Sequence, residues 1–83
     1  MDPSRMLARL EPASTLLLVV DVQEKLAAAM PQEALARLVQ NTCILLDAAR
    51  LLGVRVVATE QYPKGLGKTL PPIGVKLPSP PIE

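Results

Sequence analysis

The chain has 83 residues, with nine Lys or Arg against eight Asp or Glu and a formal net charge of +1. Its basic residues are scattered, which argues against a nucleic-acid or anionic-membrane surface, since both need clustered positive charge. Hydrophobic residues make up 49% of the chain, but Tyr62 is its single aromatic residue. The composition therefore predicts an aliphatic core in one small domain or in part of a larger one.

Two residue types limit the site chemistry further. The chain has one cysteine, Cys43, and no histidine, so we expect no internal disulfide, no transition-metal site and no cofactor. Cys43 falls within an apolar helical stretch, which favours a packed cysteine over a nucleophile. No run approaches the ~18 apolar residues of a membrane helix, and the N-terminus lacks a secretory pattern. We expect a cytoplasmic protein without membrane contact.

The first predicted elements are a lead-in and a strand. Residues 1–14 form the lead-in, in which Ser4 is expected to cap a short helix. Residues 16–20 are an unbroken aliphatic run, typical of a strand buried on both faces of a parallel sheet. Asp21 follows at the carboxyl end, where ligands of open α/β sheets bind. Asp21 is therefore the leading candidate functional residue, and a cap of the following turn is the alternative interpretation.

The middle of the chain predicts helices and a second strand. Residues 23–30 favour a turn or two of helix, and Pro31 then opens a long helix that Gly53 ends. A strand over residues 54–58 follows, so the order gives a right-handed βαβ unit with parallel strands. The long helix carries one apolar stripe at helical spacing: Leu35, Leu38, Val39, Thr42, Leu45, Leu46, Ala49 and Leu52.

The carboxyl ends of two parallel strands meet at one edge of their sheet. This places Asp21 and Gln23 beside the polar cluster at residues 59–61, which includes Gln61. Convergence of these side chains is the strongest sign of a site that the pattern offers.

Residues 62–83 hold six of the nine prolines and three of the four glycines, and we predict a loop. Gly67-Lys68-Thr69 resembles the end of a P-loop, but Tyr62 occupies the position of the first required glycine. Residues 78–81 have PxxP spacing, and a plain loop is preferred over a polyproline ligand.

One long helix cannot cover both faces of a sheet whose strands are apolar on both sides. We therefore interpret residues 15–83 as the N-terminal βαβ part of a larger α/β domain. Folding together with a partner chain is the alternative.

A family resemblance rests on three stretches: Leu17-Leu-Val-Val-Asp21-Val-Gln23, the long crossover helix, and Val57-Ala-Thr-Glu60-Gln-Tyr-Pro-Lys-Gly-Leu-Gly67. Over about residues 15–73 the chain resembles the isochorismatase-like cysteine hydrolases, in the branch of isochorismatase-domain-containing proteins. The resemblance implies an incomplete Rossmann-like parallel sheet flanked by helices, as an N-terminal fragment of that fold.

The resemblance also implies an Asp-Lys-Cys triad, in which Asp21 matches the base that takes the thiol proton. The thiolate attacks a carbonyl carbon, commonly of an amide, and water releases the acyl group. The family's lysine and nucleophilic cysteine are missing here. Lys64, Lys68 and Lys76 do not match the lysine, and Cys43 belongs to the crossover helix.

Gln23 and Gln61 match positions near the family's pocket. An orienting or substrate-contacting role is one interpretation, and structural hydrogen bonding is the other. Because the chain lacks the histidines of the nicotinamidase branch, the resemblance implies no metal.

The leading hypothesis is an inactive N-terminal fragment of a hydrolase that cleaves amide-type C–N or related bonds. Its full-length parent would take a small-molecule substrate, with no nucleic-acid or membrane partner. The alternative hypothesis is a noncatalytic relic or an oligomerisation module, and the resemblance allows a homo-oligomer.

Overall fold

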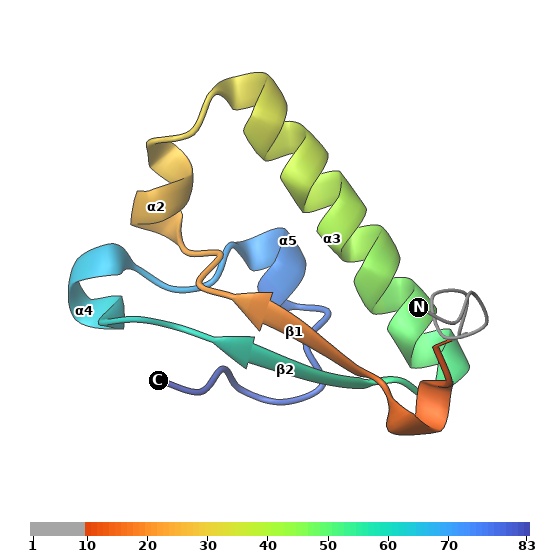
Figure 1. Ribbon diagram of the computed structural model, residues 1–83. Helices are drawn as coiled ribbons and strands as arrows, with labels where there is room; N and C mark the ends of the chain where they lie inside the picture. Colours follow the sequence, from red (N-terminus) through yellow and green to blue (C-terminus); the bar gives the residue numbers. More distant parts are fainter. Residues whose placement is uncertain (1–9) are drawn as a thin grey trace, which may run out of the picture.

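The computed structural model describes residues 10–83. The predicted helix capped by Ser4 lies outside these residues. The elements are η1 (Pro12–Ser14), β1 (Leu16–Val20), α2 (Glu24–Ala28), α3 (Gln32–Leu52), β2 (Arg55–Thr59), α4 (Pro63–Leu66) and α5 (Pro71–Gly74), as Figure 1 shows.

The βαβ unit is present, and the α/β fold class is confirmed. β1 and β2 are parallel, with a register that runs from Leu16 opposite Arg55 to Val20 opposite Thr59. The second strand is one residue later than the sequence predicted. α3 connects the two strands, and both strands therefore end at the same edge of the sheet (Figure 1).

Local sequence sets the limits of α3. Pro31 stands at its N-cap with an extended ψ of 141°, and Glu33 lies in the first turn, near the positive end of the helix dipole. At the other end Gly53 has φ 72°, a left-handed conformation that glycine adopts at low cost. The amide N–H of Val54 donates to the carbonyl of Ala49 at 2.9 Å and closes the helix.

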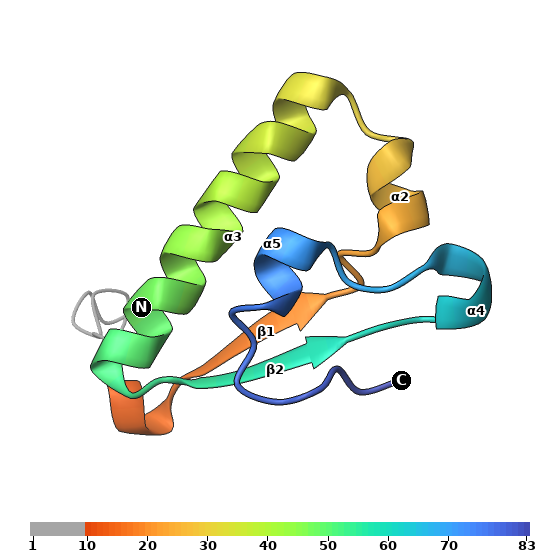
Figure 2. The ribbon, with the colours of Figure 1, turned by 180° about the vertical axis from the view of Figure 1, so that it is seen from behind.

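The core lies on one side of the sheet. Val19 and Ala58 from the strands pack with Leu46 of α3 and Ile73 of α5, and Ile73 has no exposed surface. Figures 1 and 2 show α3 and α5 on the same side of the strands. Partly buried residues surround this cluster: Leu17, Val22, Val39, Cys43, Val56, Leu70 and Leu77.

The helical stripe was only partly right. Leu46 and Ala49 are buried, but Leu45 and Leu52 are exposed by 53% and 62% of their surface. The stripe is wider than the surface that covers it within residues 10–83.

The prediction of a loop for residues 62–83 was wrong in part, because this segment contains the two short helices α4 and α5. Each begins with proline at its first helical position, where the ring presets φ and the missing N–H leaves no bond unmade. The sequence-based prediction treated these prolines as residues that interrupt helices, whereas here they begin them.

The end of the chain extends the sheet. The amide N–H of Glu60 donates to the carbonyl of Ile82 at 2.9 Å, and the Ile82 N–H donates to the carbonyl of Ala58 at 2.8 Å. Ile82 thus forms a parallel bridge beside β2, on the edge away from β1. Within residues 10–83, β2 has neighbours on both edges and β1 has a neighbour on one.

The second face of β1 is open. Leu16, Leu18 and Val20 expose 52%, 50% and 57% of their surface, whereas Val19 exposes 6%. The expectation of burial on both faces is therefore not met within residues 10–83. An incomplete sheet has this form.

Candidate functional site

Asp21 sits at the carboxyl edge of the sheet in an unusual conformation. Its φ is 53°, in the left-handed region that residues with a Cβ seldom occupy. Its amide N–H donates to the carbonyl oxygen of Thr59 at 3.1 Å and lies 3.2 Å from the Thr59 hydroxyl oxygen. The Thr59 hydroxyl in turn donates to Asp21 Oδ1 at 2.8 Å.

Asp21 was interpreted either as a functional residue or as a cap of the following turn, and these contacts argue against the cap. The residue at the N-cap of α2 is Gln23, and no side chain caps that helix. The half-buried carboxylate of Asp21 bonds across the sheet to Thr59 instead. Strained backbone of this kind is concentrated at functional sites, because the surrounding structure must hold it in place. A functional role for Asp21 stays a prediction that this geometry favours.

Gln23 is a buried structural node. Its side chain has no exposed surface, and its Nε2 donates to the carbonyl oxygens of Gln61 at 2.9 Å and Gly67 at 2.7 Å. Its Oε1 accepts from the Gln61 amide N–H at 2.7 Å. The amide group thus ties the end of β1 to the segment after β2, using both kinds of hydrogen bond that it can make.

Gln61 takes part in that node through its backbone, while the residue as a whole is exposed. Gly67 also fits the node closely. It has φ 80°, and a Cβ there would lie 2.9 Å from Cβ of Glu24. A substrate-contacting role for Gln23 or Gln61 remains a prediction, and structural hydrogen bonding is what the geometry displays.

Glu60 orders the segment that follows. Its Oε2 accepts from both the hydroxyl and the amide N–H of Thr69, each at 2.7 Å. These two bonds, the hydroxyl bond first, lower the pKa of Glu60 from its ordinary value. Burial opposes them with a smaller effect, and the charge of Lys68 adds the smallest lowering effect.

The predicted convergence is confirmed: Asp21 and Gln23 meet the segment 59–61 at one edge of the sheet. Thr59 and Glu60 belonged to the predicted polar cluster, but their individual bonds could not be read from it. Thr69, which is 8% exposed, was missed. Thr69 lies two residues after Gly67, and no local sequence pattern marks its hydrogen bonds to Glu60.

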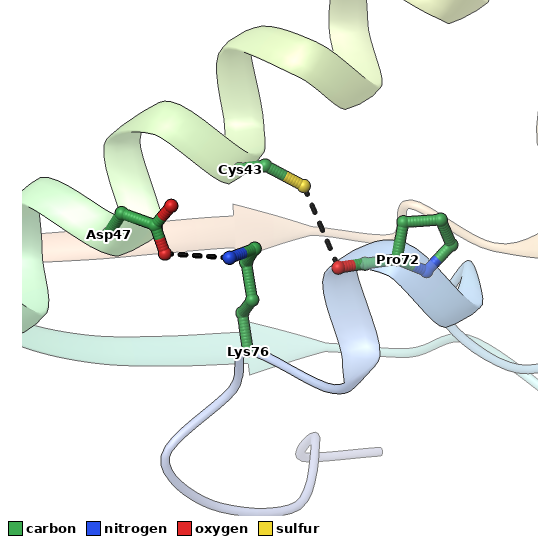
Figure 3. Close-up of polar contacts among 4 residues, drawn as sticks. All are labelled: Cys43, Asp47, Pro72 and Lys76. Carbon is green, nitrogen blue, oxygen red and sulfur yellow. Dashed lines mark hydrogen bonds and ion pairs between the residues drawn. The ribbon is translucent and has the colours of Figure 1, made fainter.

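The remaining candidates lie elsewhere. Cys43 packs partly buried in the core, as predicted, and its Sγ is 3.6 Å from the carbonyl oxygen of Pro72 (Figure 3). Lys76 Nζ forms an ion pair with Asp47 Oδ1 at 2.8 Å, so both contacts join α3 to the segment around α5. Among residues 10–83, no three His, Cys, Asp or Glu side chains gather as a metal site would require. No helix of the same part of the chain has the length and apolarity to cross a membrane.

Comparison with known proteins agrees with this fold. The isochorismatase domain family matches residues 15–80. Isochorismatase domain-containing protein 2 from Homo sapiens is 42% identical over 73 residues, covering 84% of this chain and 33% of that protein. The protein of the same name from Danio rerio is 40% identical over 70 residues, covering 84% of this chain and 34% of its own length.

A solved structure is also similar. The MAR1 ribonuclease from Caenorhabditis elegans aligns with a TM-score of 0.77 and 39% identity, over 87% of this chain and 36% of its own. The chain therefore belongs to the isochorismatase domain family, and the sequence-based assignment is confirmed. It spans about a third of the length of the curated relatives that it matches.

Proposed function

We propose that this chain supplies the aspartate of a hydrolytic site whose other catalytic groups come from protein outside these 83 residues. The observation that carries the proposal is the Asp21 carboxylate, held in a left-handed backbone at the carboxyl edge of a parallel sheet. That edge is where open α/β sheets bind ligands. Membership of the isochorismatase domain family supports the same position.

The chemistry proposed for the assembled site is hydrolysis of an amide-type C–N or related bond in a small molecule. The Asp21 carboxylate accepts the thiol proton of a cysteine as the thiolate forms a bond to the carbonyl carbon. The C–N bond breaks, and the same proton passes to the leaving nitrogen. Water then attacks the thioester, giving the carboxylic acid and the free thiol. A lysine nearby favours the ionised forms through its charge.

The open side of the sheet supports a location for the rest of the proposed site. Leu16, Leu18 and Val20 present apolar surface on one face of β1, and within residues 10–83 one edge of the strand is unpaired. Parallel sheets are normally covered on both faces. The proposal is that the portion of the domain missing from residues 1–83 covers this side and carries the cysteine and lysine to Asp21.

A second candidate function follows from the same exposed surface. α3 exposes Ile44, Leu45, Leu51 and Leu52 by 53–78% of their surface, in addition to the open residues of β1. Surfaces of this kind often mark protein–protein contacts. A noncatalytic module that associates with other subunits, or with a second copy of itself, would use them. The unpaired Cys43 supports a cytoplasmic setting for either function.

The test is reconstitution. The purified 83-residue chain is mixed with the two thirds of human isochorismatase domain-containing protein 2 that lie outside the matched region. Hydrolysis of a panel of small amides is measured, with an RNA oligonucleotide added because the Caenorhabditis elegans neighbour is a ribonuclease. We expect amide hydrolysis from the mixture, from neither part alone, and a loss of at least ~100-fold with Asp21→Asn.

The mixture with Asp21→Asn provides the matched control, because asparagine keeps the shape of the side chain and loses the base. Equal hydrolysis by the two mixtures would rule out Asp21 as the proton acceptor. A stable complex without hydrolysis, or a self-associated chain in light scattering, would favour the noncatalytic module. If the mixture cleaved the RNA and none of the amides, RNA would replace a small molecule as the proposed substrate.

A further inference from the structure

We propose that Thr59 is the positioning residue that holds the Asp21 carboxylate for proton transfer, an inference that rests on the proposed function of Asp21. Thr59 is the last residue of β2 and lies opposite Val20 in the sheet register. This register sets its hydroxyl next to the residue that follows β1. The distance from that hydroxyl to Asp21 Oδ1 is 2.8 Å.

One hydroxyl makes two contacts with one residue. Thr59 Oγ1 donates its proton to Asp21 Oδ1 and lies 3.2 Å from the Asp21 amide nitrogen, from which it accepts. A hydroxyl has one proton to give and two lone pairs to receive, so both bonds can form together. The backbone and the carboxylate of Asp21 are thereby fixed relative to each other.

The left-handed backbone of Asp21 makes this arrangement necessary. With φ at 53°, the chain turns sharply at the end of β1, and the carboxylate points across to β2. Within residues 10–83, the Thr59 hydroxyl is the side-chain group that bonds it. With Oδ1 held, Oδ2 has a fixed direction in which to receive a proton. Such fixed orientation of a catalytic group is worth large factors in rate.

The Thr59 hydroxyl can be removed by substitution without removing the backbone hydrogen bond that pairs the strands. The carbonyl oxygen of Thr59 also accepts from the Asp21 amide N–H, at 3.1 Å, so strand pairing has a bond of its own. Thr59→Val keeps the β-branched shape and removes the hydroxyl, and Thr59→Ser keeps the hydroxyl. Thr15→Val is the matched control at the other end of β1, where the threonine hydroxyl bonds Glu11 instead.

The first experiment uses the full 83-residue chain labelled with ¹³C at its aspartate carboxyl groups, at one neutral pH. We expect the Asp21 Cγ resonance of Thr59→Ser and Thr15→Val to stay with the wild type. The resonance of Thr59→Val should move toward the position of an aspartate in the urea-unfolded chain. Identical positions in all four proteins, or wild type already at the unfolded position, would overturn the inference.

The second readout is kinetic and uses the reconstituted mixture. Thr59→Val should lower kcat by about 10- to 100-fold with KM unchanged, and Thr59→Ser should restore most of it. A wild-type rate with Thr59→Val overturns the positioning role and leaves Asp21 as the base. A hydroxyl-dependent Asp21 resonance in a mixture without hydrolysis upholds the contact and refutes the proposed function. If circular dichroism shows that Thr59→Val is unfolded, the rates of Thr59→Ser and Thr59→Cys are compared instead. Since a thiol is a weak hydrogen-bond donor, Thr59→Cys should then be slower than Thr59→Ser, and equal rates would overturn the positioning role.

Discussion

The two faces of β1 differ far more in their surroundings than in their chemistry. Val19 is 6% exposed under α3 and α5, whereas its neighbours Leu18 and Val20 are 50% and 57% exposed on the opposite face. All five residues of the strand are aliphatic. Aliphatic side chains suit both faces to burial, but within residues 10–83 only one face is covered. The difference in exposure therefore comes from what packs against each face and not from residue type.

The sharpest way to test this comparison is to truncate one residue on each side. Ile73 fills the covered side with no exposed surface, so Ile73→Ala should lower the free energy of unfolding by about 2–5 kcal/mol. Leu18→Ala on the open side should cost about 1 kcal/mol or less, because half of its surface is already in water. Urea denaturation followed by circular dichroism measures both. Equal losses would show that the open face is covered in solution.

A second test compares the two glutamines at the edge of the sheet. Gln23→Met leaves the Gln61 amide N–H and two carbonyl oxygens without their buried partner, so we expect a loss of about 1–3 kcal/mol. Gln61→Met changes an exposed side chain and should stay within about 0.5 kcal/mol. The same denaturation experiment reads both. A neutral Gln23→Met would remove the structural role that its hydrogen bonds describe.

The smallest effect concerns pH. The hydrogen bonds from Thr69 lower the pKa of Glu60 in the folded chain relative to the unfolded chain. The stability from this group is thus present above its unfolded pKa and lost as the pH falls through the folded value. Glu60→Gln should flatten the decline in stability on the acid side of pH 4.5, with Gln61→Glu as a matched surface control. An unchanged acid limb would show that Glu60 is ionised equally in both states.

Regular patterns in the sequence predicted most of the fold. The aliphatic run of β1, the helical stripe and the left-handed stop at Gly53 each depend on neighbouring residues, and their order along the chain implies the parallel pairing. The convergence of Asp21 with residues 59–61 followed from that pairing. The positive φ of Asp21 and the bonds of Gln23 depend on residues some 40 positions away, so no local pattern predicts them.

Two failures have physical causes. The helices α4 and α5 were missed because proline both ends and starts helices, and only the following residues distinguish the two effects. The exposure of Leu45 and Leu52 was missed because a helical period shows which residues are apolar, while burial depends on what packs against them. Both errors fall where tertiary context decides.

Hydrogen exchange at the free edge of β1 tests most directly the claim that another part of the domain completes this sheet. Since the Asp21 N–H points to β2, the alternation along a strand points the N–H groups of Leu18 and Val20 away from it. We predict fast exchange at these two amides in the chain alone and strong protection once the other two thirds of the human relative are added. Exchange that is unchanged by this addition, or is already slow in the chain alone as a monomer, would contradict the account.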